Sequence, residues 1–138
     1  MMPFWTTQMC SINFAFPNIC LTPIPTPVGP VPVPIPYPSI AITCMAIPSQ
    51  VKVLSMAMPT HNMMTITPMS NGDSAGVMTN PLSGMFMGPQ KQLMGSIKTF
   101  VGGLPVNKML GLSGQNGMMP GAFGLTLSPS QIKVMSMV

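Results

Sequence analysis

Very few side chains in this sequence could take part in acid–base or nucleophilic chemistry. Asp73 is the only carboxylate and His61 the only imidazole among the 138 residues. A single carboxylate cannot form a general acid–base pair, and within SNGDSAG Asp73 is typical of a turn residue that bonds to nearby backbone. His61 could serve Cys20 or Cys44 as a base, but the spacing indicates no catalytic triad. We therefore expect a protein that is not an enzyme.

A metal site is the other chemistry that these residues could support. Zinc is usually bound by four cysteine or histidine side chains, and Cys10, Cys20, Cys44 and His61 just reach that number without paired spacing. One interpretation is a zinc site that uses His61, Cys20 and Cys44. The interpretation that we favour has no metal, because buried cysteines behave as small hydrophobic residues and His61 fits a turn.

The 18 methionines raise a related question. Thioether sulfurs bind copper(I), so a methionine-rich chain could carry that ion. These methionines are spread along the chain and do not cluster with histidine, which favours adaptable core packing and contact surface. We therefore expect no cofactor.

The composition narrows the class of protein. Hydrophobic residues make up 46% of the chain and charged residues 4%, whereas disordered segments combine low hydrophobicity with high charge. The net charge of +4 comes from isolated lysines, and the chain has no arginine for bidentate phosphate contacts. We expect one folded domain over residues 1–138 that does not bind nucleic acid.

Targeting signals are not evident in the sequence. The N-terminal residues lack the basic leader and apolar core of a signal peptide, and no apolar run approaches the roughly 20 residues of a spanning helix. Three cysteines, an odd number, indicate free thiols in a reducing compartment. We therefore expect a cytoplasmic protein that leaves the cell, if at all, without the general secretory signal.

Proline and glycine interrupt the chain throughout and favour short strands joined by turns. Within residues 27–38, proline occupies every second position from Pro30 to Pro38. Because proline fixes φ and has no N–H, this segment should be extended, pair along one side only and end a sheet. A stiff linker is the alternative. Residues 1–26 are expected to be an irregular lead-in.

An internal repeat is the most informative feature of the sequence. Residues 49–63 align without a gap with residues 95–109, and residues 130–138 give a third copy. Asn71-Gly72 and Asn116-Gly117, which follow the first two copies, are typical of tight turns. Each copy carries one lysine at the same position; these are Lys52, Lys98 and Lys133.

The residues around these lysines predict how each copy folds. Alternation in a strand sends neighbouring side chains to opposite faces, so we expect the lysines to face solvent. The flanking residues should then form a shared core layer; they are Val51, Val53, Ile97, Thr99, Ile132 and Val134. The sequence therefore predicts an all-β domain with three internal pseudo-repeats over residues 49–138.

Several ordered motifs resemble a known family. FPNICLTP at 16–23, PVPIPYPSIA at 32–41, SNGDSAGV at 70–77, GSIKTFVGGLPVNKM at 95–109 and SPSQIKVMSMV at 128–138 resemble the PAAR-like domain of bacterial type VI secretion. The resemblance implies a small conical β-prism or β-helix-like domain. It also implies a non-enzymatic protein that sits on the blunt end of the trimeric VgrG spike, sharpens it and helps to puncture target membranes.

The resemblance implies further partners and a place of action. One chain with three similar units would match the three strand edges of a VgrG trimer, so one copy per trimer is expected. A toxin effector or chaperone would be a further partner, and the target-cell membrane a transient one. The protein would stay in the bacterial cytoplasm before firing and then be secreted by the injection apparatus.

This sequence departs from the family pattern in two ways. Zinc in PAAR proteins is associated mainly with histidine ligands and a cysteine, whereas His61 is the only histidine here. The chain also reaches Val138 without a toxin extension, so an effector is expected to bind non-covalently or to belong to a neighbouring protein. The alternative function is an effector-loading adaptor that uses the Pro-rich segment and a methionine surface; a third is a metal-binding protein.

Overall fold

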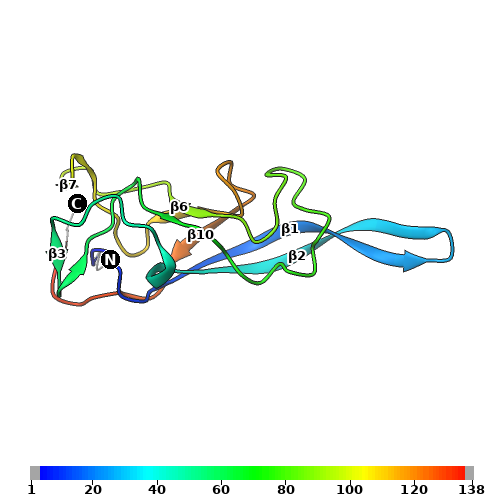
Figure 1. Cartoon of the computed structure of the whole chain (residues 1–138), viewed down its shortest axis with the longest axis horizontal. Helices are drawn as coiled ribbons and strands as arrows, with labels where there is room; N and C mark the ends of the chain where they lie inside the picture. Colours follow the sequence, from blue (N-terminus) through cyan, green and yellow to red (C-terminus); the bar gives the residue numbers. More distant parts are fainter. Residues whose placement is uncertain (1–3, 136–138) are drawn as a thin grey trace.

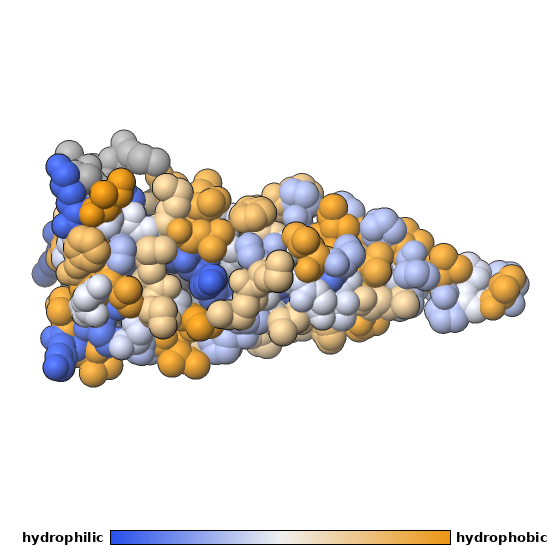
Figure 2. All heavy atoms as spheres, turned by 90° about the horizontal axis from the view of Figure 1, so that it is seen from above, coloured by the Kyte–Doolittle hydropathy of each residue, from blue (hydrophilic) through white to orange (hydrophobic). Residues whose placement is uncertain are grey.

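The computed structural model describes residues 4–135 of the chain. The molecule is a cone that narrows from a wide base to a thin tip (Figure 2). Strands run along its long axis, and the short hairpins β3–β4 and β7–β8 lie at the wide end (Figure 1). The only helix in the described part is the 3-10 turn η1 (Thr43–Met45). The prediction of an all-β fold is confirmed.

Six strands form the antiparallel sheet that makes the wall of the cone, in the order β2-β1-β10-β9-β6-β5. Four more strands pair as the two short hairpins at the base. The strand bounds are β1 Ile12–Thr26, β2 Gly29–Ile42, β3 Leu54–Ser55, β4 Met58–Pro59, β5 Ile66–Thr67, β6 Gln90–Gln92, β7 Phe100–Val101, β8 Leu104–Pro105, β9 Leu112–Gln115 and β10 Ala122–Thr126.

The two outer strands of this sheet also meet, which closes the wall into a prism. Ile40 of β2 exchanges both backbone hydrogen bonds with Asn71, which follows β5, at N–O distances of 2.7 Å. Nearer the base, the N–H of Ile47 donates to the carbonyl of Ile66 in β5 at 2.8 Å. Closure leaves few unpaired strand edges around the wide part of the cone.

The tip of the cone is the far end of the β1–β2 hairpin, which extends beyond the rest of the sheet (Figure 1). Pro23 pairs with Pro32 and Pro25 with Pro30. Nearer the base Pro34 pairs with Leu21, whose N–H and carbonyl point outward to another segment. The prolines therefore occupy the pairs that make no hydrogen bonds within the hairpin.

This arrangement explains how a free-standing hairpin avoids adding further strands. The outward-facing backbone nitrogens belong to prolines, which have no N–H to donate to another strand. The prediction that the Pro-rich segment ends a sheet and pairs along one side is confirmed for residues 30–38. The expectation of an irregular lead-in over residues 1–26 is wrong for 12–26, because Ile12–Thr26 form the longest strand of the described part; residues 4–11 lie outside the named strands, and residues 1–3 are not described.

The interior of the cone is largely polar. The buried hydrophobic residues are small; they are Ala15, Cys20, Ala41, Ala46, Val101, Val106 and Ala122. Threonine, serine, asparagine and glutamine fill most of the remaining interior. The strands approach closely at Gly124, where a Cβ would clash with the carbonyl oxygen of Phe14. Among residues 4–135, the leucine, isoleucine, methionine and phenylalanine side chains are all exposed or half-buried.

Within residues 4–135, no helix is long and apolar enough to cross a membrane.

Candidate docking surface at the base

The base is organised by three short segments that bond to one another in a ring. The N–H of Thr6 donates to the carbonyl of Asn107 at 2.9 Å, that of Asn107 to His61 at 3.0 Å, and that of His61 back to Thr6 at 2.9 Å. Each of the three residues gives one bond and receives one. This cyclic pattern is what a threefold axis through the base requires.

Residues on either side of the ring repeat the same symmetry. The N–H of Gln8 donates to the carbonyl of Pro59 at 3.0 Å, that of Met63 to Pro105 at 3.1 Å, and that of Met109 to Phe4 at 2.7 Å. Each donor lies two residues after a ring residue, and each acceptor lies two residues before another ring residue. Isolated bridges join Thr7 to Thr60, Asn62 to Val106 and Trp5 to Lys108. A single chain therefore builds three equivalent units, and the predicted threefold repeat is present in the structure; the end of its third copy, residues 136–138, lies outside the described residues.

The third unit is completed by both ends of the chain. The N–H of Thr60 donates to the carbonyl of Val53, and the N–H of Val106 donates to the carbonyl of Thr99. Each acceptor belongs to the copy of the repeat that precedes the donor. The equivalent partner of Val134 is Trp5, whose N–H donates to its carbonyl at 3.2 Å. Sequence comparison missed this unit's second half, because residues 4–8 share little sequence with residues 59–63.

Each repeated lysine lies in a tight turn that is fixed by a side chain. The Oε1 atom of Gln50 accepts the N–H of Val53 at 2.9 Å. The hydroxyl of Ser96 accepts the N–H of Thr99 at 3.3 Å. Gln131 holds the third turn in the same way, accepting from Val134 at 2.8 Å. Capping of this kind competes with strand pairing, so residues 52–53, 97–98 and 132–133 form bends.

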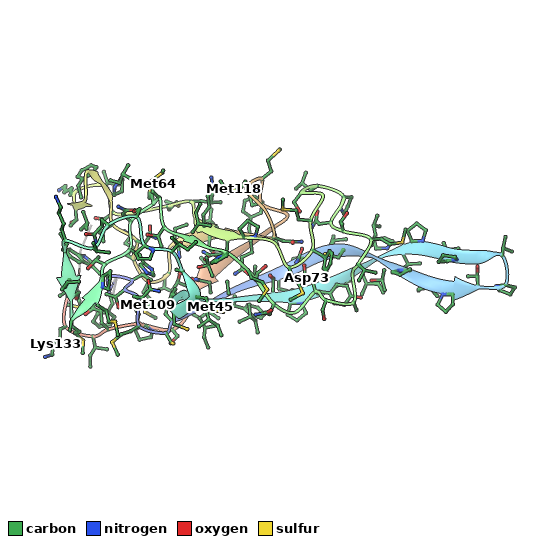
Figure 3. The ribbon with its side chains drawn as sticks, viewed as in Figure 1. Met45, Met64, Asp73, Met109, Met118 and Lys133 are labelled. Atoms are coloured by element: carbon green, nitrogen blue, oxygen red, sulfur yellow. The ribbon has the colours of Figure 1, made fainter. Side chains whose placement is uncertain are left out.

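These turns decide which way the flanking residues point. Lys52, Lys98 and Lys133 are exposed, as predicted, and Lys133 lies at the wide end of the cone (Figure 3). The predicted core layer is wrong: Val51 and Ile97 are 66% and 79% exposed. Strand alternation does not apply in a turn, so lysine and flank share one surface. The remaining flanks are also outside the core; Ile132 and Val53 are exposed, and Thr99 and Val134 half-buried.

Apolar side chains continue around this surface with the same symmetry. Each turn closes at the residue whose N–H is capped, which is Val53, Thr99 or Val134. The next residues, Leu54, Phe100 and Met135, occupy equivalent positions, and all three are exposed. Together with Val51, Ile97, Ile132 and the three lysines, they define what we call the base surface. Exposed apolar residues gathered at one end of a molecule mark an interaction surface.

His61 lies beneath the base surface and is buried. Its Nε2 contacts the Oε1 of Gln8 at 2.8 Å, while the Gln8 amide nitrogen donates to the carbonyls of Cys44 and Ala46. These bonds orient the amide oxygen toward the ring, so Nε2 carries the hydrogen. Burial lowers the pKa of His61 from 6.5 to about 4, and the imidazole is neutral at physiological pH.

A second buried group of polar residues surrounds Asp73, where the cone narrows (Figure 3). The carboxylate accepts hydrogen bonds from Asn18 Nδ2 at 2.8 Å, from the Cys20 thiol at 3.4 Å and from the Met87 N–H at 3.2 Å. Asn116 donates to the Asn18 Oδ1 at 3.1 Å. The expectation that Asp73 bonds only local backbone is wrong, because its side chain joins β1 to the β5–β6 loop.

Burial, followed by the nearby charge of Asp73, raises the pKa of the Cys20 thiol to about 12. A thiol held protonated in this way is a poor nucleophile and metal ligand. The structure does not join Cys20 with Cys44 and His61 as the zinc interpretation requires. Among residues 4–135, no three His, Cys, Asp or Glu side chains form a group that could hold a metal ion.

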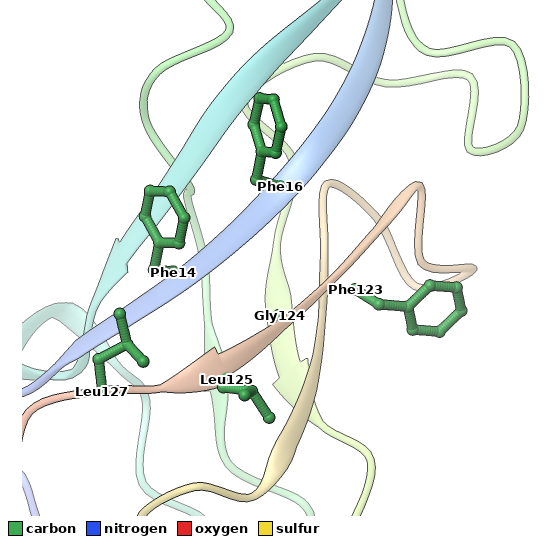
Figure 4. Close-up of a pocket in the computed structure, with 6 residues that line it drawn as sticks. All are labelled: Phe14, Phe16, Phe123, Gly124, Leu125 and Leu127. Carbon is green, nitrogen blue, oxygen red and sulfur yellow. The ribbon is translucent and has the colours of Figure 1, made fainter.

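Apart from the base, the flank of the cone carries an apolar hollow of about 220 Å³. Phe14 and Phe16 from β1 lie on one side of it, with Leu125 and Leu127 on the other (Figure 4). The ring of Phe123 also lines it. None of the residues that line this hollow belongs to the base surface.

Comparison with known proteins identifies the class of this chain. The family model for the toxin PAAR-like domain matches residues 11–121, most of the chain. The protein therefore belongs to the toxin PAAR-like domain family, as its motifs indicated. Searches of curated proteins and of solved structures gave no match.

Proposed function

We propose that this protein caps the blunt end of the trimeric VgrG spike of a type VI secretion system, with one chain per trimer. The observation that carries the proposal is the closed ring of hydrogen bonds among Thr6, His61 and Asn107. It gives a single chain three equivalent faces around one axis. A trimeric partner presents three equivalent strand ends, and only a threefold surface can contact all of them alike.

The other end of the molecule supports the same function. The β1–β2 hairpin has no equivalent of its length in the other two units, so the threefold base narrows to one tip. Val28 at its turn is 98% exposed, and the prolines along the hairpin prevent further strands from pairing. The proposed role at that tip is mechanical: to puncture a target membrane and carry effectors with it, without catalysis.

Charge on the base surface indicates the chemistry of the partner's end. Lys52, Lys98 and Lys133 are exposed there, whereas Asp73, the only carboxylate of the chain, is buried. We expect acidic side chains or free carbonyl groups on the VgrG end that meets this surface. Such complementarity mainly speeds association and weakens at high salt.

A single substitution on the base surface tests the docking face. Ile97→Asp should leave the fold unchanged, because the side chain is exposed. It should weaken VgrG binding by about tenfold or more, because an unpaired carboxylate would be desolvated at the interface. Met118→Asp is the matched control: Met118 is also exposed and lies on the flank (Figure 3). Binding constants for both variants, with circular dichroism to verify folding, give the result.

The outcome that contradicts the proposal is equal binding by the two variants. The second candidate, an effector-loading adaptor, is favoured by the apolar hollow between Phe16 and Leu125. An adaptor that holds its cargo in this hollow and does not cap the spike would be unaffected by Ile97→Asp. The same pair of variants therefore separates the two functions.

A further inference from the structure

Two exposed cysteines face each other where the tip hairpin joins the base. The β1–β2 ladder ends at the pair Ile12 and Ile42. Pairing continues one step further, since the N–H of Thr43 donates to the Ser11 carbonyl at 3.0 Å and the Ser11 N–H to the Thr43 hydroxyl at 2.8 Å. The next residues on the two chains are Cys10 and Cys44, and both are exposed free thiols.

The strand β2 ends just before this pair, because Thr43–Met45 form the 3-10 turn η1. The carbonyl of Thr43 therefore accepts the N–H of Ala46, and its hydroxyl accepts the N–H of Ser11 in place of a ladder bond. These bonds keep the segment of Cys10 beside that of Cys44, and a disulfide spans Cα atoms roughly 4.4–6.8 Å apart.

The segments that carry the two thiols are held together from both sides. Gln8 donates its amide hydrogens to the Cys44 and Ala46 carbonyls, each at 2.9 Å, and the Thr43 hydroxyl donates to the Met9 carbonyl at 2.8 Å. The Cys44 thiol is near enough to act as a hydrogen-bond partner that raises the pKa of Cys10. The two thiols therefore lie beside each other on the surface.

We propose that Cys10 and Cys44 form an intramolecular disulfide when the protein meets an oxidising environment. The oxidant is a disulfide, either a small molecule such as glutathione disulfide or a thiol–disulfide oxidoreductase. One cysteine thiolate attacks it and forms a mixed disulfide, releasing one thiol. The second cysteine then displaces the other thiol, so that one S–S bond is cleaved, one is formed, and two protons pass to the released thiols.

The bond would fasten the neck of the tip hairpin to the chain that leads to the base ring. Formation of this disulfide depends only on the geometry of the chain itself, so it is expected whether or not the chain docks on VgrG. If the proposed function is also correct, the bond would be absent in the reducing cytoplasm and form after delivery. Cys20 cannot substitute for either partner, because it is buried beside Asp73.

Oxidation of the folded full-length protein with glutathione disulfide tests the proposal. After denaturation and alkylation, mass spectrometry should find one modifiable thiol in the wild type and none in Cys20→Ser, with no glutathione attached to either. Cys10→Ser and Cys44→Ser should each fail to form the internal bond. The wild type and Cys20→Ser should also melt at a higher temperature when oxidised, and the other two variants should not.

Three results would overturn the proposal. These are glutathione adducts on Cys10 and Cys44 without an internal bond, disulfide-linked dimers in dilute solution, or loss of the bond in Cys20→Ser. Oxidation of the denatured chain serves as the control, since all three cysteines can then react and mixed pairings should appear. VgrG binding does not enter the readout, so failure here leaves the capping function untouched.

Discussion

Replacing Asp73 by alanine should destabilise the fold by about 3–5 kcal/mol, because it leaves several buried donors without an acceptor. The carboxylate accepts bonds from Asn18, Cys20 and the backbone of Met87, and it is fully buried. Since small domains are stable by only about 5–15 kcal/mol, the variant should be largely unfolded at elevated temperature. Urea denaturation followed by circular dichroism measures the loss.

Two further variants make this result specific. Asp73→Asn keeps one oxygen that can accept from Asn18, so it should recover part of the lost stability. Ser74→Ala changes the neighbouring exposed residue and should alter stability by no more than about 0.5 kcal/mol. A finding that Asp73→Ala is as stable as Ser74→Ala would show that the carboxylate does not hold the tip hairpin in place.

Stability should fall as the pH drops from about 6.5 to about 4, because of His61. Burial lowers the pKa of this histidine to about 4 in the folded chain, against 6.5 for an ordinary imidazole. Between these values the unfolded chain binds a proton that the folded chain does not. The free energy of unfolding is therefore unaffected by this group above pH 6.5. Below that pH it falls by up to about 1.4 kcal/mol per pH unit, and the total loss reaches about 3 kcal/mol near pH 4. Urea denaturation at several pH values measures it.

The pseudosymmetry supplies the control for this prediction. His61→Asn introduces the residue that stands at the equivalent position 107, and the backbone bonds of the ring do not depend on the side chain. Stability of this variant should depend less steeply on pH over the same range. If wild type and variant lose stability in parallel, another group is responsible and the neutral, buried imidazole is not the cause.

The repeat was predictable because it recurs as a sequence pattern around Lys52, Lys98 and Lys133. Its local conformation was not, because alternation of apolar and charged residues looks the same in a strand and in a turn. The deciding residues are Gln50 and Gln131, whose side chains accept backbone N–H groups three residues later. Their position two residues before the lysine was the available signal.

The long-range pairings of the fold could not be predicted from the sequence either. Trp5 completes the third unit with Val134, across nearly the whole chain, although no sequence motif links them. Asp73 reads as a turn residue from its neighbours, and only the fold brings Asn18 to it. The edge position of the Pro-rich strand was predictable, since it depends on a local property, the missing N–H of proline.

One chain should supply a complete threefold cap, and native mass spectrometry of its complex with VgrG measures how many chains bind. We propose that each of the three equivalent units around the axis meets one VgrG subunit, so that a second copy would find no free site on the same trimer end. We expect a complex of one chain with three VgrG subunits. Three chains bound to three VgrG subunits would contradict it.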